Sequence, residues 1–285
     1  MGSTQSPLTS SLWQRLPAFV RAIIIGGLLV GAGIVPWVVL VTINLRTGAA
    51  VPWSVAAMAL YLAAYWFYLR GWGPPKSTKE FRRKHLRAAS LSHDAWNLSL
   101  LAGTAGLACM LVLLFGVYAR VVSLPSDIFP DTSGVSPYAV AAYIFMLAAV
   151  AGVTEEAGYR GYMQSLIESH YGPTAAILAT AIVFGLAHFN LTLMPVYLFV
   201  AVLLGVITYI SNSILPGVLL HAAYDFLMVV LNWQFGNPVP SRIDLAAGPD
   251  AIFWAACVGA SVFAAITLWA LGQLRRAVRV TTHEL

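Results

Sequence analysis

The stretch from residue 20 to residue 43 reads VRAIIIGGLLVGAGIVPWVVLVTI and contains one charged side chain, Arg21. A helix needs about 20 mainly apolar residues to cross the hydrocarbon core of a bilayer. This stretch is therefore predicted to span a membrane. Further spans are predicted at residues 53–69, 98–118, 137–157, 173–193, 195–212, 216–233 and 251–272.

The composition of the whole chain agrees with this pattern. The 285 residues are 59% hydrophobic and 9% charged, whereas a soluble domain is roughly 45–50% apolar and about 25% charged. Two cysteines, Cys109 and Cys257, are too few to hold together a disulfide scaffold of this size. The net charge of +5 does not indicate nucleic-acid binding, because no solvated basic domain is present. We therefore expect an all-α polytopic membrane protein, a single domain over residues 1–285 with about eight transmembrane helices around a central intramembrane cavity.

Basic residues are unevenly distributed between the predicted loops. Cytoplasmic segments of membrane proteins carry an excess of Lys and Arg. The basic segment, residues 70–97, is therefore predicted to be cytoplasmic, together with both termini. It is interpreted as a loop that sets the topology, and the alternative is that residues 76–97 lie along the anionic inner surface of the membrane. The basic residues on the predicted cytoplasmic side are Arg15, Arg21, seven residues between Arg70 and Arg87, Arg275, Arg276 and Arg279, against Arg46, Arg120 and Arg242 on the other side.

A few ionisable side chains lie in or beside the predicted spans. An ionised group at the bilayer centre costs about 2.5–3.5 kcal/mol even on a lenient scale, so each such group calls for a functional or structural reason. The residues concerned are Glu155, Glu156, Arg160, His188, His221 and Asp225.

The first cluster contains two adjacent glutamates. Glu156 and Arg160 are four residues apart, so they can pair on one face of a helix. Glu155 lies about 100° further round the helix and has no cation of its own nearby in the sequence. A desolvated carboxylate of this kind can accept a proton from water, as a general base must. The alternative is a three-residue ion network that fastens two helices together.

Two further clusters contain histidines. His188 follows Phe184 by four residues, and Asp225 follows His221 by four. The second pair is either a carboxylate that fixes an imidazole tautomer or a buried pair that satisfies its own hydrogen bonds. Gly172 and the proline after it predict a turn midway between Glu155 and His188. Antiparallel helices joined there would bring these two side chains to one level, so three helices are expected to gather a glutamate, two histidines and an aspartate.

The order of these motifs resembles a known family. Glu-Glu-x-x-x-Arg at residues 155–160, Phe-x-x-x-His at 184–188 and His-x-x-x-Asp at 221–225 are similar to the motifs of the CPBP family. This family comprises CAAX prenyl endopeptidases and bacteriocin-processing membrane proteases and is also called Abi. The resemblance places a motif-bearing catalytic core at about residues 137–233.

The resemblance also implies roles for individual residues. Glu155 would activate the attacking water, and His188 would position this water or share its proton. His221 and Asp225 would stabilise the oxyanion. Members that process prenylated peptides commonly carry asparagine where this chain has Asp225, and an ionised aspartate cannot donate a hydrogen bond. Asp225 is therefore expected either to be protonated or to orient His221. The site would be supported by Glu156, Arg160 and Phe184.

A metal ion is the open question about cofactors. Two histidines and a glutamate can form a zinc site with a free position for water, here Glu155, His188 and His221. The chain lacks a His-Glu-x-x-His helix, and the resemblance favours a metal-free mechanism. We therefore expect no cofactor.

The leading hypothesis is an intramembrane endopeptidase that acts on a membrane-anchored or lipidated peptide or protein. Its expected partners are this substrate and the lipid bilayer, and its expected location is the plasma membrane of a prokaryote. One alternative is a non-catalytic scaffold or bacteriocin-immunity protein of the same fold. A second alternative is a proton-coupled transporter, because intramembrane Glu, His and Asp also build proton relays.

Overall fold

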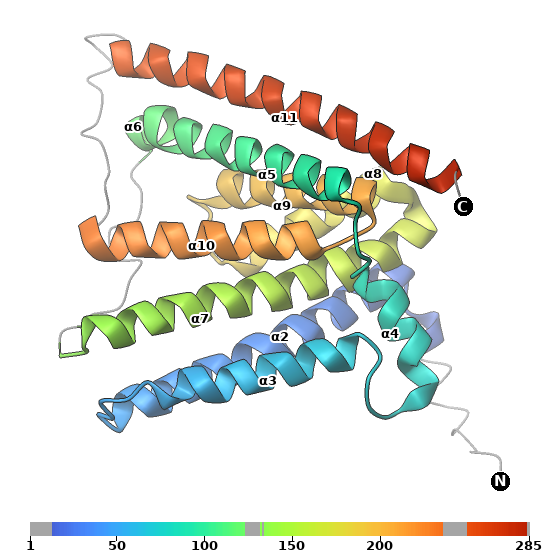
Figure 1. Ribbon diagram of the computed structural model, residues 1–285, viewed down its shortest axis with the longest axis vertical. Coiled ribbons are helices and arrows are strands. Elements are labelled where there is room, and N and C mark those ends of the chain that lie inside the picture. Colours follow the sequence, from blue (N-terminus) through green and yellow to red (C-terminus); the bar gives the residue numbers. More distant parts are fainter. Residues whose placement is uncertain (1–12, 123–131, 133, 236–249, 284–285) are drawn as a thin grey trace.

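The chain forms a bundle of long helices (Figure 1). The structure, a computed structural model, describes residues 13–122, 132, 134–235 and 250–283, and this part of the chain contains no strand. Its α-helices are α2 (Ala18–Arg46), α3 (Trp53–Leu69), α4 (Lys79–Leu86), α5 (His93–Leu113), α6 (Ala119–Val121), α7 (Pro137–Glu155), α8 (Gln164–Ala187), α9 (Met194–Ser211), α10 (Leu215–Phe235) and α11 (Ala251–His283). A 3-10 turn, η1 (Lys76–Thr78), precedes α4, and two π-helical segments, η2 (Leu114–Tyr118) and η3 (Glu156–Met163), follow α5 and α7.

The predicted all-α membrane fold is confirmed, but the count of eight spans is not. Six of the described helices are long and apolar enough to cross a membrane. The difference has two causes. Trp53–Leu69 has 17 residues, which is short for a span, and Pro137–Ala187 is a single helical run that contains two of the predicted spans.

A break inside this long run separates the two predicted spans. Gly172 has φ 80° and ψ 168°, which is not a helical conformation, and Pro173 follows it. Glycine adopts positive φ without a steric penalty, and proline begins the next helical turn. The turn predicted at this position is therefore present within α8.

The second of these spans is shorter than predicted. Residues 173–193 were expected to be helical, but α8 ends at Ala187. Phe189 has a positive φ of 50°, and the side chain of Asn190 accepts a hydrogen bond from the backbone N–H of Leu193 at 3.1 Å. These local features favour a loop, so His188 caps the helix instead of lying within an apolar run.

Small residues let the helices that carry the site approach closely. A Cβ atom on Gly33 of α2 would lie 2.1 Å from Cγ2 of Thr154, the residue that directly precedes the two glutamates. A Cβ on Gly152 would lie 2.8 Å from the Val218 carbonyl oxygen of α10. Both glycines therefore allow contacts that are closer than a Cβ atom at the same position would permit. They fix the position of α7 between α2 and α10.

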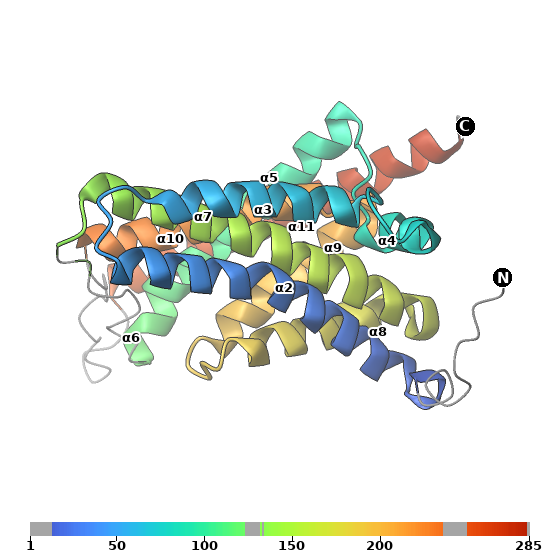
Figure 2. The ribbon, with the colours of Figure 1, turned by 90° about the horizontal axis from the view of Figure 1, so that it is seen from below.

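Both ends of the described chain lie at one end of the bundle. Figures 1 and 2 show the beginning of α2, the helix α4 and the end of α11 at this end, while α6 and the end of α2 lie at the other. This arrangement agrees with an even number of crossings. The side of the membrane that this end faces stays a prediction, and Arg242 lies outside the described residues.

Candidate active site

The two glutamates lie where α7 changes into a wider helix. Glu155 is the last residue of α7 and Glu156 is the first of η3. All eight residues of η3 are buried. Such π-helical segments often occur at functional sites, because the wider turn changes the direction of the side chains.

Glu156 is completely buried and holds two other site residues. Its Oε1 lies 2.9 Å from Arg160 Nη1, as the spacing of four residues predicted. Within the described residues Arg160 Nη1 has no hydrogen-bond partner, so this contact is an ion pair only. The same Oε1 accepts a hydrogen bond from His221 Nδ1 at 2.8 Å. Glu156 therefore orients His221 in addition to pairing with Arg160.

His221 is buried on α10, with its other nitrogen turned toward two carboxylates. Its Nε2 lies 3.5 Å from Asp225 Oδ2 and 3.9 Å from Glu155 Oε2. Because a carboxylate only accepts, the hydrogen bond to Glu156 places a proton on Nδ1. The sequence did not indicate the hydrogen bond from Nδ1 to Glu156, and whether Asp225 is protonated or orients the ring from the Nε2 side stays a prediction.

Glu155 is nearly buried, with 12% of its side chain exposed. Within the described part of the chain its Oε2 has no hydrogen-bond partner. The same oxygen lies 3.9 Å from His221 Nε2. The carboxylate is therefore largely desolvated, lies beside His221 and is available to accept a proton.

His188 is half-buried and is held from two directions. Its Nδ1 donates a hydrogen bond to the Phe184 carbonyl oxygen at 2.8 Å, which leaves Nε2 without a proton in the neutral ring. Its imidazole stacks on the ring of Tyr197, with centroids 4.0 Å apart and planes 25° apart. The orientation of this histidine is thus well defined.

The ring of Phe184 lies between the members of the site. The Arg160 guanidinium carbon lies 4.4 Å from its centroid, and the rings of His188 and His221 lie 4.6 and 5.9 Å from it. A cation over an aromatic face is stabilised by the ring quadrupole, most strongly where water is excluded. Phe184 therefore contacts one member of each of the three motifs, and its supporting role stays a prediction.

The structure brings the predicted residues together and adds two that the sequence did not indicate. Tyr197 of α9 stacks on His188, and Gly217 of α10 leaves room for the Glu156 carboxylate. Neither residue lies in one of the three motifs. An aromatic side chain and a glycine in apolar helices give no local signal, so only the packing of the helices reveals them.

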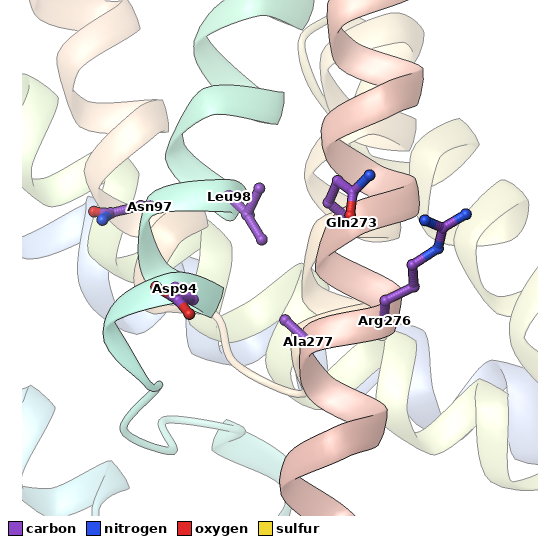
Figure 3. Close-up of a pocket in the computed structure, with 6 residues that line it drawn as sticks. All are labelled: Asp94, Asn97, Leu98, Gln273, Arg276 and Ala277. Carbon is purple, nitrogen blue, oxygen red and sulfur yellow. The ribbon is translucent and has the colours of Figure 1, made fainter.

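The described residues do not group three His, Cys, Asp or Glu side chains in a way that could hold a metal ion. The zinc alternative at Glu155, His188 and His221 therefore gains no support, and the expected absence of a cofactor stays a prediction. A central cavity also stays a prediction. An open cleft of about 480 Å³ lies elsewhere, between the beginning of α5 and the end of α11 (Figure 3), and is lined by Asp94, Asn97, Leu98, Gln273, Arg276 and Ala277.

The site geometry can be compared with known proteins. Residues 137–227 match the family model described as Type II CAAX prenyl endopeptidase Rce1-like. The resemblance carried by the three motifs is confirmed. The match covers about a third of the chain and includes every predicted site residue. No significant match to a curated protein or to a solved structure was found.

The match to the Rce1-like family and the apolar helices together indicate where the protein is located and which class of protein it resembles. The chain is an integral membrane protein. Its residues 137–227 support a CAAX-type intramembrane protease fold, and the family indicates a hydrolase. Bacteriocin processing and the prokaryotic source stay predictions.

Proposed function

We propose that this chain hydrolyses a peptide bond in a membrane-associated or lipidated protein or peptide, with Glu155 as the general base. The observation that carries the proposal is the Glu155 carboxylate, which is nearly buried, lies 3.9 Å from His221 Nε2 and leaves Oε2 without a hydrogen-bond partner among the described residues. A general base must hold a free lone pair close to the groups that stabilise the transition state.

Each chemical step has an acceptor or a donor. Glu155 takes a proton from water as the water oxygen attacks the carbonyl carbon of the scissile bond. His188 positions this water through its unprotonated Nε2. The C–N bond then breaks, and the proton held by Glu155 passes to the leaving amine, so the carboxylate is regenerated.

The oxyanion is stabilised by a proton on His221 Nε2. Because Nδ1 already carries the proton donated to Glu156, His221 must be an imidazolium to donate from Nε2 as well. Three carboxylates surround the two cations of the site, His221 and Arg160, and this excess of negative charge favours the imidazolium form; the carboxylates are those of Glu155, Glu156 and Asp225. One well-placed donor of this kind is worth about 3–4 kcal/mol in the transition state. In this proposal Asp225 acts as an anion beside His221 and does not itself donate to the oxyanion.

We also propose that the end of the bundle that carries α4 faces the cytoplasm. Arg70 and Arg87 bound a segment with seven basic residues, which favours this orientation by the positive-inside rule. The site then lies closer to the cytoplasmic face, because Glu155 ends a helix that begins at the opposite face.

The test compares three forms of the protein in the cells that produce it. Glu155→Gln removes the base while keeping the shape of the side chain, and Glu80→Gln makes the same chemical change at a site that is 84% exposed. New peptide termini in the membrane fraction are identified by mass spectrometry. Losing a general base lowers a rate by about 10²- to 10⁴-fold. We therefore expect termini that depend on the wild-type protein to persist in Glu80→Gln and to disappear in Glu155→Gln.

Equal amounts of protein and equal thermal unfolding of the two variants serve as the folding control. Termini that persist in Glu155→Gln would reject the mechanism and favour a non-catalytic role. The absence of any terminus that depends on the wild-type protein would reject proteolysis itself.

A further inference from the structure

Five exposed basic residues lie together on α4 and on the loop before it. They are accompanied by two exposed aromatic side chains, Trp72 (68% exposed) and Phe81 (43% exposed). Glu80 is the only acidic residue of α4, and it approaches Arg83 no closer than 3.9 Å. This group, called the α4 basic surface below, consists of Arg70, Lys76, Lys79, Arg83, Lys84, Trp72 and Phe81.

A buried arginine holds this surface in one shape. Arg82 is 4% exposed, and its guanidinium lies 4.0 Å from the centroid of the Tyr68 ring. It donates hydrogen bonds to the carbonyl oxygens of Tyr68 at 2.7 Å, Trp72 at 3.0 Å, Gly73 at 3.0 Å and Pro75 at 3.4 Å. The loop carbonyls therefore converge on Arg82. Because the loop is already ordered, a ligand does not have to order it on binding.

The inner face of α4 is fixed to the core of the bundle. His85 Nδ1 lies 2.8 Å from Ser165 Oγ, and the Tyr162 hydroxyl donates to the Arg82 carbonyl oxygen at 3.1 Å. Directly after α4, Arg87 makes two hydrogen bonds to Glu168, at 3.0 and 2.8 Å. The helix thus has one face committed to the protein and an opposite face that carries basic side chains.

The direction of α4 differs from that of the long helices. It runs across the end of the bundle, and the second view shows it nearly end-on beside the same helix ends (Figures 1 and 2). Since the long helices cross the membrane, α4 lies along the membrane plane at the level where the spans end. Aromatic residues favour this interfacial level, and long basic side chains extend from it toward the lipid head groups.

We propose that the α4 basic surface binds the head groups of anionic phospholipids. Charge complementarity favours this occupant, because five cations and one carboxylate leave a net charge of +4. The surface is also continuous with apolar side chains that face the membrane, since Phe67 is 50% exposed and packs against Trp72 with ring centroids 5.6 Å apart. An acidic segment of a protein partner would use the same charges but would not need this apolar border. The proposal is independent of the catalytic role of Glu155.

The test uses Trp72 as a local reporter. The protein and its Trp72→Phe variant are placed in nanodiscs of equimolar phosphatidylglycerol and phosphatidylcholine, with bromine on the acyl chains of one lipid or the other. The emission that differs between the two proteins belongs to Trp72. Each basic side chain near an anionic surface contributes a factor of about five in binding. We therefore expect bromine on phosphatidylglycerol to quench Trp72 at least about twice as strongly as bromine on phosphatidylcholine.

Two triple variants that lose the same number of charges test whether the preference for phosphatidylglycerol comes from the α4 basic surface. The triple variant Lys79→Gln, Arg83→Gln, Lys84→Gln should lose the preference for phosphatidylglycerol. The control Arg15→Gln, Arg275→Gln, Arg276→Gln removes three exposed charges at the same end of the bundle and should keep it. Raising the salt from about 0.15 M to about 1 M shortens the screening length from about 8 to about 3 Å and should weaken the preference in the wild type.

Several results would overturn the proposal. Equal quenching by the two brominated lipids in the wild type would do so without any charge variant, so misfolding of the triple variant cannot obscure the outcome. Equal loss of the preference in both triple variants would show that net charge alone acts. A response of Trp72 to an acidic peptide in phosphatidylcholine nanodiscs, without a lipid preference, would assign the surface to a protein partner.

Discussion

Replacing Gly217 by alanine tests whether Glu156 is confined as the site geometry requires. A Cβ atom at residue 217 would lie 2.8 Å from Glu156 Oε2, and ordinary contacts begin at 3.4 Å. The carboxylate therefore has to withdraw by the difference, about 0.6 Å. It has little freedom to do so, because its other oxygen contacts His221 at 2.8 Å and Arg160 at 2.9 Å.

The expected magnitude follows from three terms. An extra methyl group in a packed interior costs about 1–3 kcal/mol. Weakening a charged hydrogen bond adds part of its net value, which is about 1.5–3 kcal/mol. Alanine is favoured over glycine within a helix by up to about 1 kcal/mol, which offsets part of this cost. We therefore expect Gly217→Ala to lower the free energy of unfolding by about 1–3 kcal/mol.

The catalytic effect should be similar in free energy to the effect on stability, since a tenfold change in rate corresponds to about 1.4 kcal/mol. The displaced carboxylate moves the His221 ring, and small errors of position in an active site cost up to about 10²-fold in rate. We expect kcat to fall by about 10- to 100-fold with little change in KM. Cleavage of a substrate identified from the new termini is measured together with unfolding by sodium dodecyl sulfate in mixed micelles.

Gly27→Ala is the matched control, because a Cβ atom on Gly27 of α2 has no atom within 4 Å. It should leave kcat unchanged and preserve or slightly raise stability. If Gly217→Ala behaves like Gly27→Ala in both measurements, Glu156 is not confined and does not position His221.

Two further predictions concern an aromatic ring and a histidine. Tyr197→Phe keeps the stack on His188 and should retain kcat within about threefold. Tyr197→Leu removes the stack and should lower kcat about tenfold at unchanged KM. Equal kcat in the wild type and both variants would exclude a positioning role for Tyr197. Burial, with added repulsion from Lys84 and Arg87, lowers the pKa of His85 from 6.5 to about 4. The folded state therefore disfavours protonation of His85. The contribution of the neutral His85 ring to the free energy of unfolding is complete above pH 6.5 and is lost as the pH falls toward 4. Thermal unfolding of His85→Gln should depend less steeply on pH over this range than that of the wild type, and identical slopes would contradict the reasoning.

The sequence predicted the helices well because their signal is local. Apolar length alone located every predicted span, and each of them contains a helix in the structure. The ends were less predictable. The span expected to end at residue 193 stops at Ala187, because a positive φ at Phe189 and the hydrogen bond from Leu193 to Asn190 favour a loop that hydropathy does not detect.

The candidate site was predictable to the extent that it depends on spacing. The pair of Glu156 and Arg160 follows from four residues along one helix. The hydrogen bond between Glu156 and His221 joins residues 65 apart, so it depends on how α10 packs against α7. Spacing within His-x-x-x-Asp suggested instead that Asp225 holds the ring. Gly217, one turn before His221, leaves the space that the Glu156 carboxylate occupies. The sequence does not reveal this function of the glycine, because it depends on which helix packs against α10.

The change from α7 to η3 explains how two consecutive glutamates serve one histidine. Neighbouring side chains on an α-helix diverge by about 100°, so they ordinarily face different neighbours. Here Glu156 contacts one nitrogen of His221, while Glu155 faces the other. A wider turn that begins between them, together with the close approach of α10, lets both carboxylates face this one ring. The role of each glutamate therefore follows from which nitrogen it faces: Glu156 is engaged in holding the ring, and Glu155 remains available for the proton.

The other side of η3 supports the α4 basic surface. A Cβ atom on Gly161 would lie 3.1 Å from the His85 carbonyl oxygen, and Tyr162 bonds the backbone of Arg82. Arg160 precedes these two residues and contacts Glu156 and Phe184 within the site. One buried segment of eight residues thus contacts the candidate active site through Glu156 and Arg160, and α4 through the two residues that follow Arg160. A displacement of α4 would have to move η3 or break these contacts, so the position of Glu156 depends on how firmly α4 is held at the end of the bundle.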